Sequence, residues 1–93
     1  MPIPKIYDRQ KACLELIGEE SGLLFLDGYG AAIIGVTERE GHSLVVYDEH
    51  EILRILRKRD GMPRDDAEEF FDFNIASAWM GEQTPIILRR IGR

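Results

Sequence analysis

The candidates for binding a small molecule or for taking part in a reaction are Asp27, Tyr47, Asn74 and Thr84. Asp27 and Tyr47 come where expected strands end, and binding sites often collect at strand ends in folds that combine helices and sheets. Asn74 falls on the apolar face of an expected helix, where an amide without a hydrogen-bond partner costs about 1–3 kcal/mol. The simpler interpretation is structural: a turn explains Asp27, and Asn74 holds a neighbouring loop, at 27–29 or at 81–84.

No combination of residues identifies a nucleophile, a metal site or a cofactor. Cys13 is the only cysteine, and it falls on the apolar side of an expected helix, where an inert buried thiol is the ordinary outcome. The only histidines are His42 and His50, and residues 48–51 do not share a helix face on which they could chelate a cation. The glycines near residue 30 lack the Lys and Ser or Thr of a phosphate loop. The sequence therefore predicts no catalytic residue, no metal and no cofactor, and it favours a non-enzymatic function.

Charge is unevenly distributed along this chain of 93 residues. Twelve Lys and Arg against 17 Asp and Glu give a net charge of −5, which makes direct binding of nucleic acid through its phosphates an unfavoured function. Residues 61–82 carry six carboxylates against one cation, Arg64, whereas residues 83–93 carry three arginines. The simpler interpretation is a solvated helix face followed by a basic tail.

A sharper interpretation is that this acidic stretch, with two aromatic residues outside or at the edge of its apolar stripe, docks onto a basic partner. The candidate partner-binding residues are Asp65, Asp66, Glu68, Glu69, Asp72, Phe73 and Trp79.

The first half of the chain predicts a helix, a short strand and a hairpin. Residues 5–20 place apolar side chains on one side of a helix that Gly22 ends. The apolar run 23–26 is too short for a helix and predicts a strand. Residues 31–37 and 43–47 predict the two strands of a hairpin with a long loop. Because both strands are apolar at consecutive positions, we expect helices to cover both faces of the sheet.

The second half predicts two helices and a final strand. Asp48 is expected to cap a helix that stops at Asp60 and that carries cationic side chains near its C-terminal end. Pro63 suits the first position of a longer helix, which is expected to reach about Met80. Residues 86–88 then return to the sheet.

These elements predict a single α+β domain over residues 1–93. The expected architecture is a small, mostly antiparallel sheet of three or four strands packed against two or three helices, in the order α-β-β-β-α-α-β. A chain of this length buries a modest core, so a homodimer is an alternative way to cover apolar surface. The single cysteine, the absence of a signal-like segment and apolar runs far below the roughly 20 residues that span a bilayer predict a cytoplasmic protein without membrane contact.

Six motifs follow one another between residues 25 and about 88: FLDGY, AIIGV, VYD, RDGM, AEEFFDFNI and GEQTP. This ordered series resembles a family of small uncharacterised proteins of bacteriophages and prophages, whereas the first 22 residues lie outside the pattern. The family has no assigned activity, so the resemblance implies no catalytic residue. It implies a phage or prophage origin, and small acidic phage proteins of this kind are commonly accessory factors that bind a host component.

Three functions follow as hypotheses. The first is a phage accessory protein, in the cytoplasm of the bacterial host, that binds and inhibits a host protein that processes or defends against foreign nucleic acid, because an acidic surface can occupy a site built for phosphates. The second is an enzyme or small-molecule binder with a pocket at the strand ends. The third is a self-assembling structural component in which the strand ends and Trp79 supply the interface.

Overall fold

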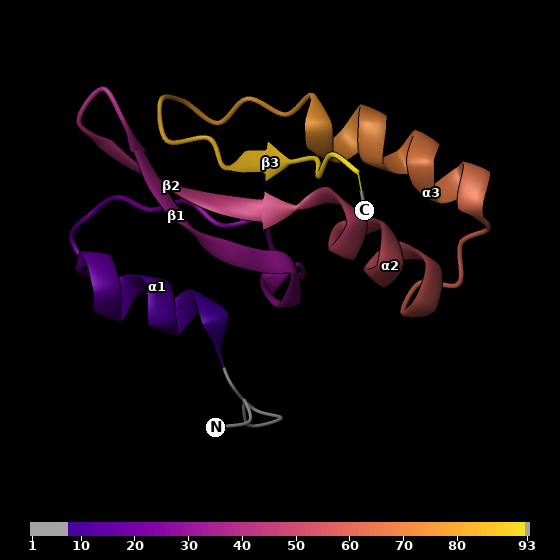
Figure 1. Ribbon diagram of the computed structural model, residues 1–93, viewed down its shortest axis with the longest axis horizontal. Coiled ribbons are helices and arrows are strands. Elements are labelled where there is room, and N and C mark those ends of the chain that lie inside the picture. The colour runs from indigo at the N-terminus through magenta and orange to yellow at the C-terminus, as the bar shows by residue number, and fades with distance from the viewer. Residues whose placement is uncertain (1–7, 93) are drawn as a thin grey trace.

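An antiparallel hairpin lies at the centre of the fold (Figure 1). The computed structural model describes residues 8–92, and in it β1 (Ile33–Arg39) pairs with β2 (His42–Asp48). The turn between them consists of Glu40 and Gly41, both at positive φ, which is the geometry that suits a two-residue hairpin turn. The predicted hairpin is confirmed, and the predicted long loop is wrong.

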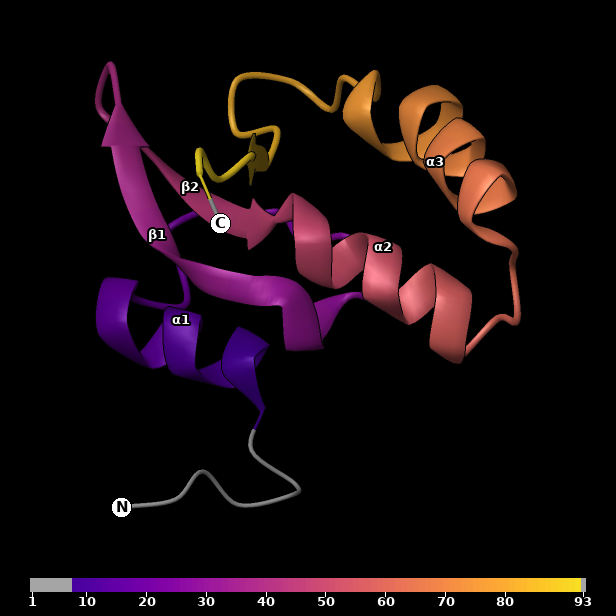
Figure 2. The ribbon, with the colours of Figure 1, turned by 45° about the vertical axis from the view of Figure 1, so that its right-hand side comes forward.

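The third strand of the sheet comes from the end of the chain. β3 (Ile86–Leu88) pairs with β2 in parallel, so the strand order is β1-β2-β3 and the sheet is mixed. A parallel pair needs a long crossover, and α2 (Glu49–Lys58) and α3 (Arg64–Phe71) lie within it. Figure 2 shows these two helices side by side at one end of the sheet. The α+β fold is thus as predicted, with an antiparallel arrangement in one of the two strand pairs.

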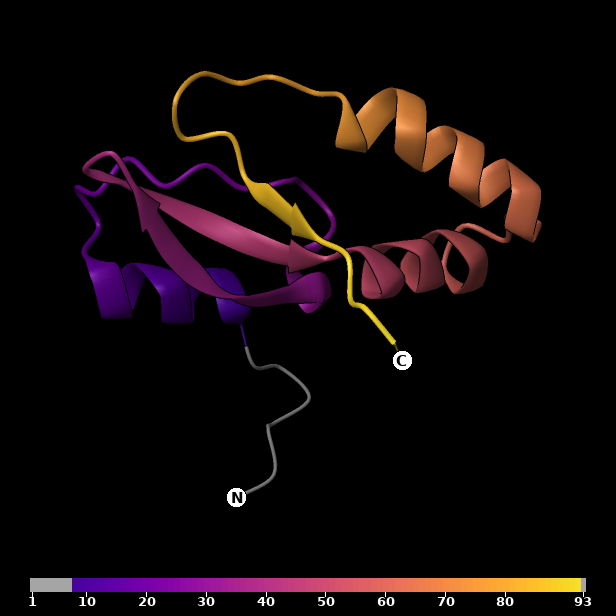
Figure 3. The ribbon, with the colours of Figure 1, turned by 45° about the horizontal axis from the view of Figure 1, so that its top comes forward.

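The first helix packs against β1 on the side away from α3 (Figure 3). α1 (Arg9–Ile17) begins at Asp8, whose carboxylate accepts a hydrogen bond from the Lys11 amide, and ends at Gly18 at positive φ. It is shorter than the predicted helix 5–20, of which residues 5–7 lie outside the described part of the chain.

The prediction of a strand at 23–26 is wrong, because this apolar segment has no regular secondary structure. Leu23, Phe25 and Leu26 pack against the core, but the Leu26 amide donates to the Tyr47 hydroxyl at 2.8 Å instead of to a neighbouring strand. A short 3₁₀ turn, Gly30–Ala32, then leads into β1, so Ala31 lies before the strand rather than in it.

The third helix is also shorter than predicted. α3 ends at Phe71, and a single π-helical turn, Asp72–Ala76, replaces the expected continuation to Met80. The segment after it folds into a turn in which the Thr84 hydroxyl accepts from the Met80 amide at 2.7 Å and donates to a backbone carbonyl. The polypeptide therefore turns back toward the hairpin instead of extending α3.

The core lies where α2, α3 and the sheet meet. Tyr47, Ile52 and Leu56 are fully buried in one cluster, to which α3 contributes Phe71. In β2 two consecutive residues, Leu44 and Val45, are both fully buried, so both faces of this strand are covered. In β1 the expected cover on both faces is wrong, because Ile34 is 47% exposed. Within residues 8–92, no helix combines the length and the apolar character that crossing a bilayer requires.

Candidate functional site

Four exposed carboxylates of α3 and the turn after it form what we call the acidic surface: Asp65, Asp66, Glu69 and Asp72. At about 100° per residue these positions project away from Ala67 and Phe71, through which α3 packs on the core. None of the four forms an ion pair with another described residue. The remaining predicted acid, Glu68, lies to one side and pairs with Arg64 at 3.6 Å. Most of the predicted acidic set therefore shares one direction and forms no ion pair with the other residues that the structure describes.

Two of the three arginines near the end of the chain form ion pairs elsewhere, and the third, Arg93, lies outside the described residues. Arg89 forms two hydrogen bonds with Glu49, at 2.6 and 3.1 Å. Arg90 forms two with Asp48, at 2.7 and 3.1 Å, and this carboxylate is fully buried. Hydrogen bonding to Glu49 raises the pKa of Arg89, and the charge of Asp72 adds a smaller contribution of the same sign. The predicted basic tail thus folds back onto the start of α2 at these two positions.

One of the two predicted aromatic residues borders the acidic surface. Phe73 follows Asp72 in the π-helical turn, and its side chain is 75% exposed. A π-helical turn inserts one residue into the helical spacing, and such turns are frequent at functional sites. Ser77 donates to the Phe73 carbonyl at 3.0 Å and so satisfies a backbone group at the end of this turn.

The structure places Trp79 away from α3, in the segment that turns back toward the hairpin. Trp79 is 72% exposed and lines a shallow hollow with residues of the hairpin tip, including Arg39 and His42. The His42 ring lies 2.8 Å from the Glu82 carboxylate across this hollow. The predicted partner-binding set is therefore divided, because Phe73 lies beside the acidic surface and Trp79 lies near the hairpin turn.

The four residues of the predicted pocket do not converge on one cavity. Tyr47 is fully buried and accepts from the Leu26 amide, and Thr84 closes its own local turn. Asp27 is exposed in the loop before the 3₁₀ turn. The prediction that Asn74 lies on the buried face of a helix is wrong. Asn74 is exposed, and its amide donates to the Phe70 carbonyl one turn earlier at 3.1 Å. It holds neither of the two loops that the sequence suggested.

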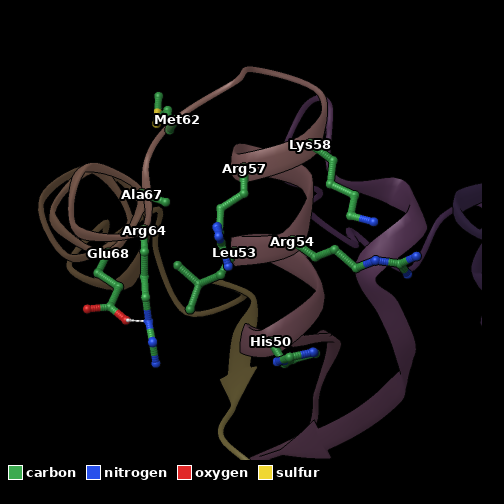
Figure 4. Close-up of a pocket in the computed structure, with 9 residues that line it drawn as sticks. All are labelled: His50, Leu53, Arg54, Arg57, Lys58, Met62, Arg64, Ala67 and Glu68. Atoms are coloured by element: carbon green, nitrogen blue, oxygen red, sulfur yellow. Dashed lines mark ion pairs between the residues drawn. The ribbon is translucent and has the colours of Figure 1, made fainter.

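A basic groove between α2 and α3 was not anticipated from the sequence (Figure 4). Its volume is about 590 Å³, and its lining residues are His50, Leu53, Arg54, Arg57, Lys58, Met62, Arg64, Ala67 and Glu68. Leu53 and Arg57 reach from α2 toward α3, whereas Arg54 and Lys58 lie on the other side of α2. The sequence places the cationic residues of α2 near its C-terminal end, but it does not show that Arg64 of α3 joins them.

The described residues offer little for metal binding or nucleophilic chemistry. No group of three or more His, Cys, Asp or Glu side chains within residues 8–92 is arranged to hold a metal ion. Burial raises the pKa of the Cys13 thiol, which disfavours the reactive thiolate. The structure presents two exposed surfaces of opposite charge on α2 and α3.

This chain matches no protein-family model, no curated protein and no solved structure.

Proposed function

We propose that this protein is a non-enzymatic accessory factor of phage or prophage origin that binds a host protein through the acidic surface of α3. The observation that carries the proposal is that no carboxylate of this surface forms an ion pair with another of residues 8–92, because Arg89 and Arg90 pair with Glu49 and Asp48 and only the charge of Asp72 also acts on Arg89. Carboxylates that have no ion-pair partner in the described part of the chain remain available to a basic partner. Such charges steer association and favour partners with complementary surfaces.

Phe73 gives the acidic surface an apolar anchor. Protein interfaces gain most of their binding free energy from a few side chains, among which aromatic residues are enriched, with charged residues around them. A ring that is 75% exposed gains contact area when a partner covers it. Charge and apolar contact thus lie next to each other at the C-terminal end of α3.

The host target that suits this surface is a protein with a site for phosphates. A row of carboxylates on a rigid helix can occupy a groove of arginines and lysines that otherwise binds a nucleic-acid backbone. The resemblance to phage proteins, the net charge of −5 and the acidic surface all support a target that processes or defends against foreign nucleic acid, in the cytoplasm of the bacterial host.

The proposal is tested by affinity capture from bacterial lysates with quantitative mass spectrometry. The test variant is Asp66→Lys/Glu69→Lys, and the matched control is Glu15→Lys/Glu19→Lys, which makes the same change in net charge at exposed positions in and after α1. We expect the wild type and the control to capture the same protein and the test variant to lose it. Addition of heparin should release the captured protein, because heparin competes for a phosphate-binding site.

A protein that the test variant captures as well as the wild type does would contradict the proposal. So would the absence of any specific partner at low ionic strength, where attraction between exposed charges is strongest.

A further inference from the structure

The basic groove has a composition that suits one kind of occupant. Its apolar surface is formed by Leu53, Met62 and Ala67. Arg57 of α2 and Arg64 of α3 lie beside this surface, and Arg54 and Lys58 add positive charge from the other side of α2. Glu68 is the one carboxylate in the lining, and it already pairs with Arg64. A helix that combines carboxylates with an exposed apolar side chain is complementary to such a groove.

A nucleotide is a poorer fit for the same groove. No Phe, Tyr or Trp lines it, so the His50 imidazole is the one ring in the lining on which a base could stack. The aliphatic and thioether side chains at its centre suit an apolar protein side chain instead.

The chain itself carries a helix of the complementary kind. α3 presents the acidic surface, and Phe73 follows at its C-terminal end. We propose that the basic groove binds α3 of a second copy of this chain, and that two copies associate in this way about a two-fold axis. Both the acidic surface and the groove adjoin α3, so one axis can form the two identical contacts at the same time.

The position of the groove along α3 fixes the expected pairing. The groove lies beside the N-terminal half of this helix, from Arg64 to Glu68. In an antiparallel, two-fold arrangement the C-terminal half of the other α3, which carries Glu69, lies opposite together with Phe73 of the following π-helical turn. Carboxylates of the second copy then face the guanidinium groups, and its phenyl ring faces the apolar surface around Leu53.

This inference uses the acidic surface on which the proposed function also rests, so the dimer and the host partner compete for it. Self-association would keep the surface covered until a partner with a stronger basic site displaces the second copy. The variant Arg57→Glu/Arg64→Glu reverses charges of the groove and leaves the acidic surface intact. It is therefore expected to lose self-association and to capture at least as much partner as the wild type.

The test is sedimentation velocity of the full chain with no partner present. We expect the wild type to associate in a concentration-dependent manner at low salt, and to dissociate at about 0.5 M salt, where screening shortens the range of charge interactions to a few ångströms. Each double charge reversal, Arg57→Glu/Arg64→Glu or Asp66→Lys/Glu69→Lys, should weaken association at least about tenfold. An equimolar mixture of the two variants should form a mixed dimer, because each reversed surface then meets an opposite charge in the other variant.

Restored association in the mixture also excludes misfolding as the reason why each variant alone associates more weakly than the wild type. A wild type that stays monomeric at low salt and high concentration would overturn the inference, and so would a dimer that neither variant weakens. A mixture that fails to associate when both variants retain the wild-type circular dichroism spectrum would overturn it too. All these outcomes leave the capture experiment unaffected, so the two proposals can fail separately.

Discussion

Replacement of Tyr47 by phenylalanine tests how the segment before β1 is held on the sheet. Tyr47 is fully buried, and its hydroxyl is the group to which the Leu26 amide donates, at 2.8 Å. Tyr47→Phe keeps the ring in the core and removes this acceptor. A donor left without a partner in a partly buried position costs about 1–3 kcal/mol, so we expect the free energy of unfolding to fall by about 1–2 kcal/mol.

The assay is urea denaturation followed by far-ultraviolet circular dichroism, combined with amide hydrogen exchange. The midpoint should fall with an unchanged dependence on urea, and the Leu26 amide should lose protection. Tyr29→Phe is the control: the ring of Tyr29 lies 5.2 Å from the Arg59 guanidinium near the surface and keeps this contact as phenylalanine, so the expected loss is below about 0.5 kcal/mol.

The difference in stability between the wild type and Tyr47→Phe is also expected to depend on pH. Burial raises the pKa of Tyr47 in the folded protein, which outweighs the opposing effect of the hydrogen bond from Leu26. The folded state therefore retains this proton when the unfolded chain has lost it, above about pH 10. The stability advantage of the wild type over Tyr47→Phe should be complete below that pH and should shrink as the pH rises further. An advantage that grows with pH, or a Leu26 amide that stays protected in the variant, would refute the reasoning.

Three further predictions concern other elements. Asp48→Ala should lower the free energy of unfolding by about 1–3 kcal/mol because it removes the cap of α2 and a buried carboxylate that binds Arg90, as thermal denaturation can measure. Gly41→Ala should cost about 1 kcal/mol because Gly41 has φ 81°, whereas Gly35→Ala, at an uncrowded position without positive φ, should cost less in the same assay. Phe73→Ala should leave unfolding nearly unchanged but reduce partner capture, which Trp79→Ala should leave intact because Trp79 lies near the hairpin turn.

Much of the fold could be predicted because its signals are local. Asp48 accepts a hydrogen bond from the amide of Glu51, three residues later, as the capping pattern indicated. The hairpin and the strand Ile86–Leu88 are confirmed because runs of β-branched residues between polar turns indicate strands without reference to the rest of the chain.

The elements that were predicted wrongly depend on contacts distant in sequence. The sheet has unpaired outer edges at β1 and β3, but the segment 23–26 pairs with neither of them, and its Leu26 amide donates to the Tyr47 side chain instead. After the early end of α3, Ile75 of the π-helical turn packs in the core, and Thr84 closes the turn that follows. No periodic pattern within the helix itself contains this information.

Of the candidate site, too, one part could be predicted from the sequence and another part could not. The acidic surface followed from a run of like charges on one helix, which a sequence shows directly. The basic groove needs Arg57 of α2 and Arg64 of α3 to lie on the same face, and only tertiary packing brings them together. The separation of Trp79 from Phe73 likewise depends on where the π-helical turn ends.

The central claim is that the acidic surface of α3 is where a host partner binds. Two-dimensional NMR of the isotope-labelled protein, titrated with the captured partner, tests this most directly. The account predicts that the shifted amide signals are concentrated in residues 64–73. Shifts confined to α1 or to the hairpin, with the signals of residues 64–73 unmoved at saturation, would contradict it.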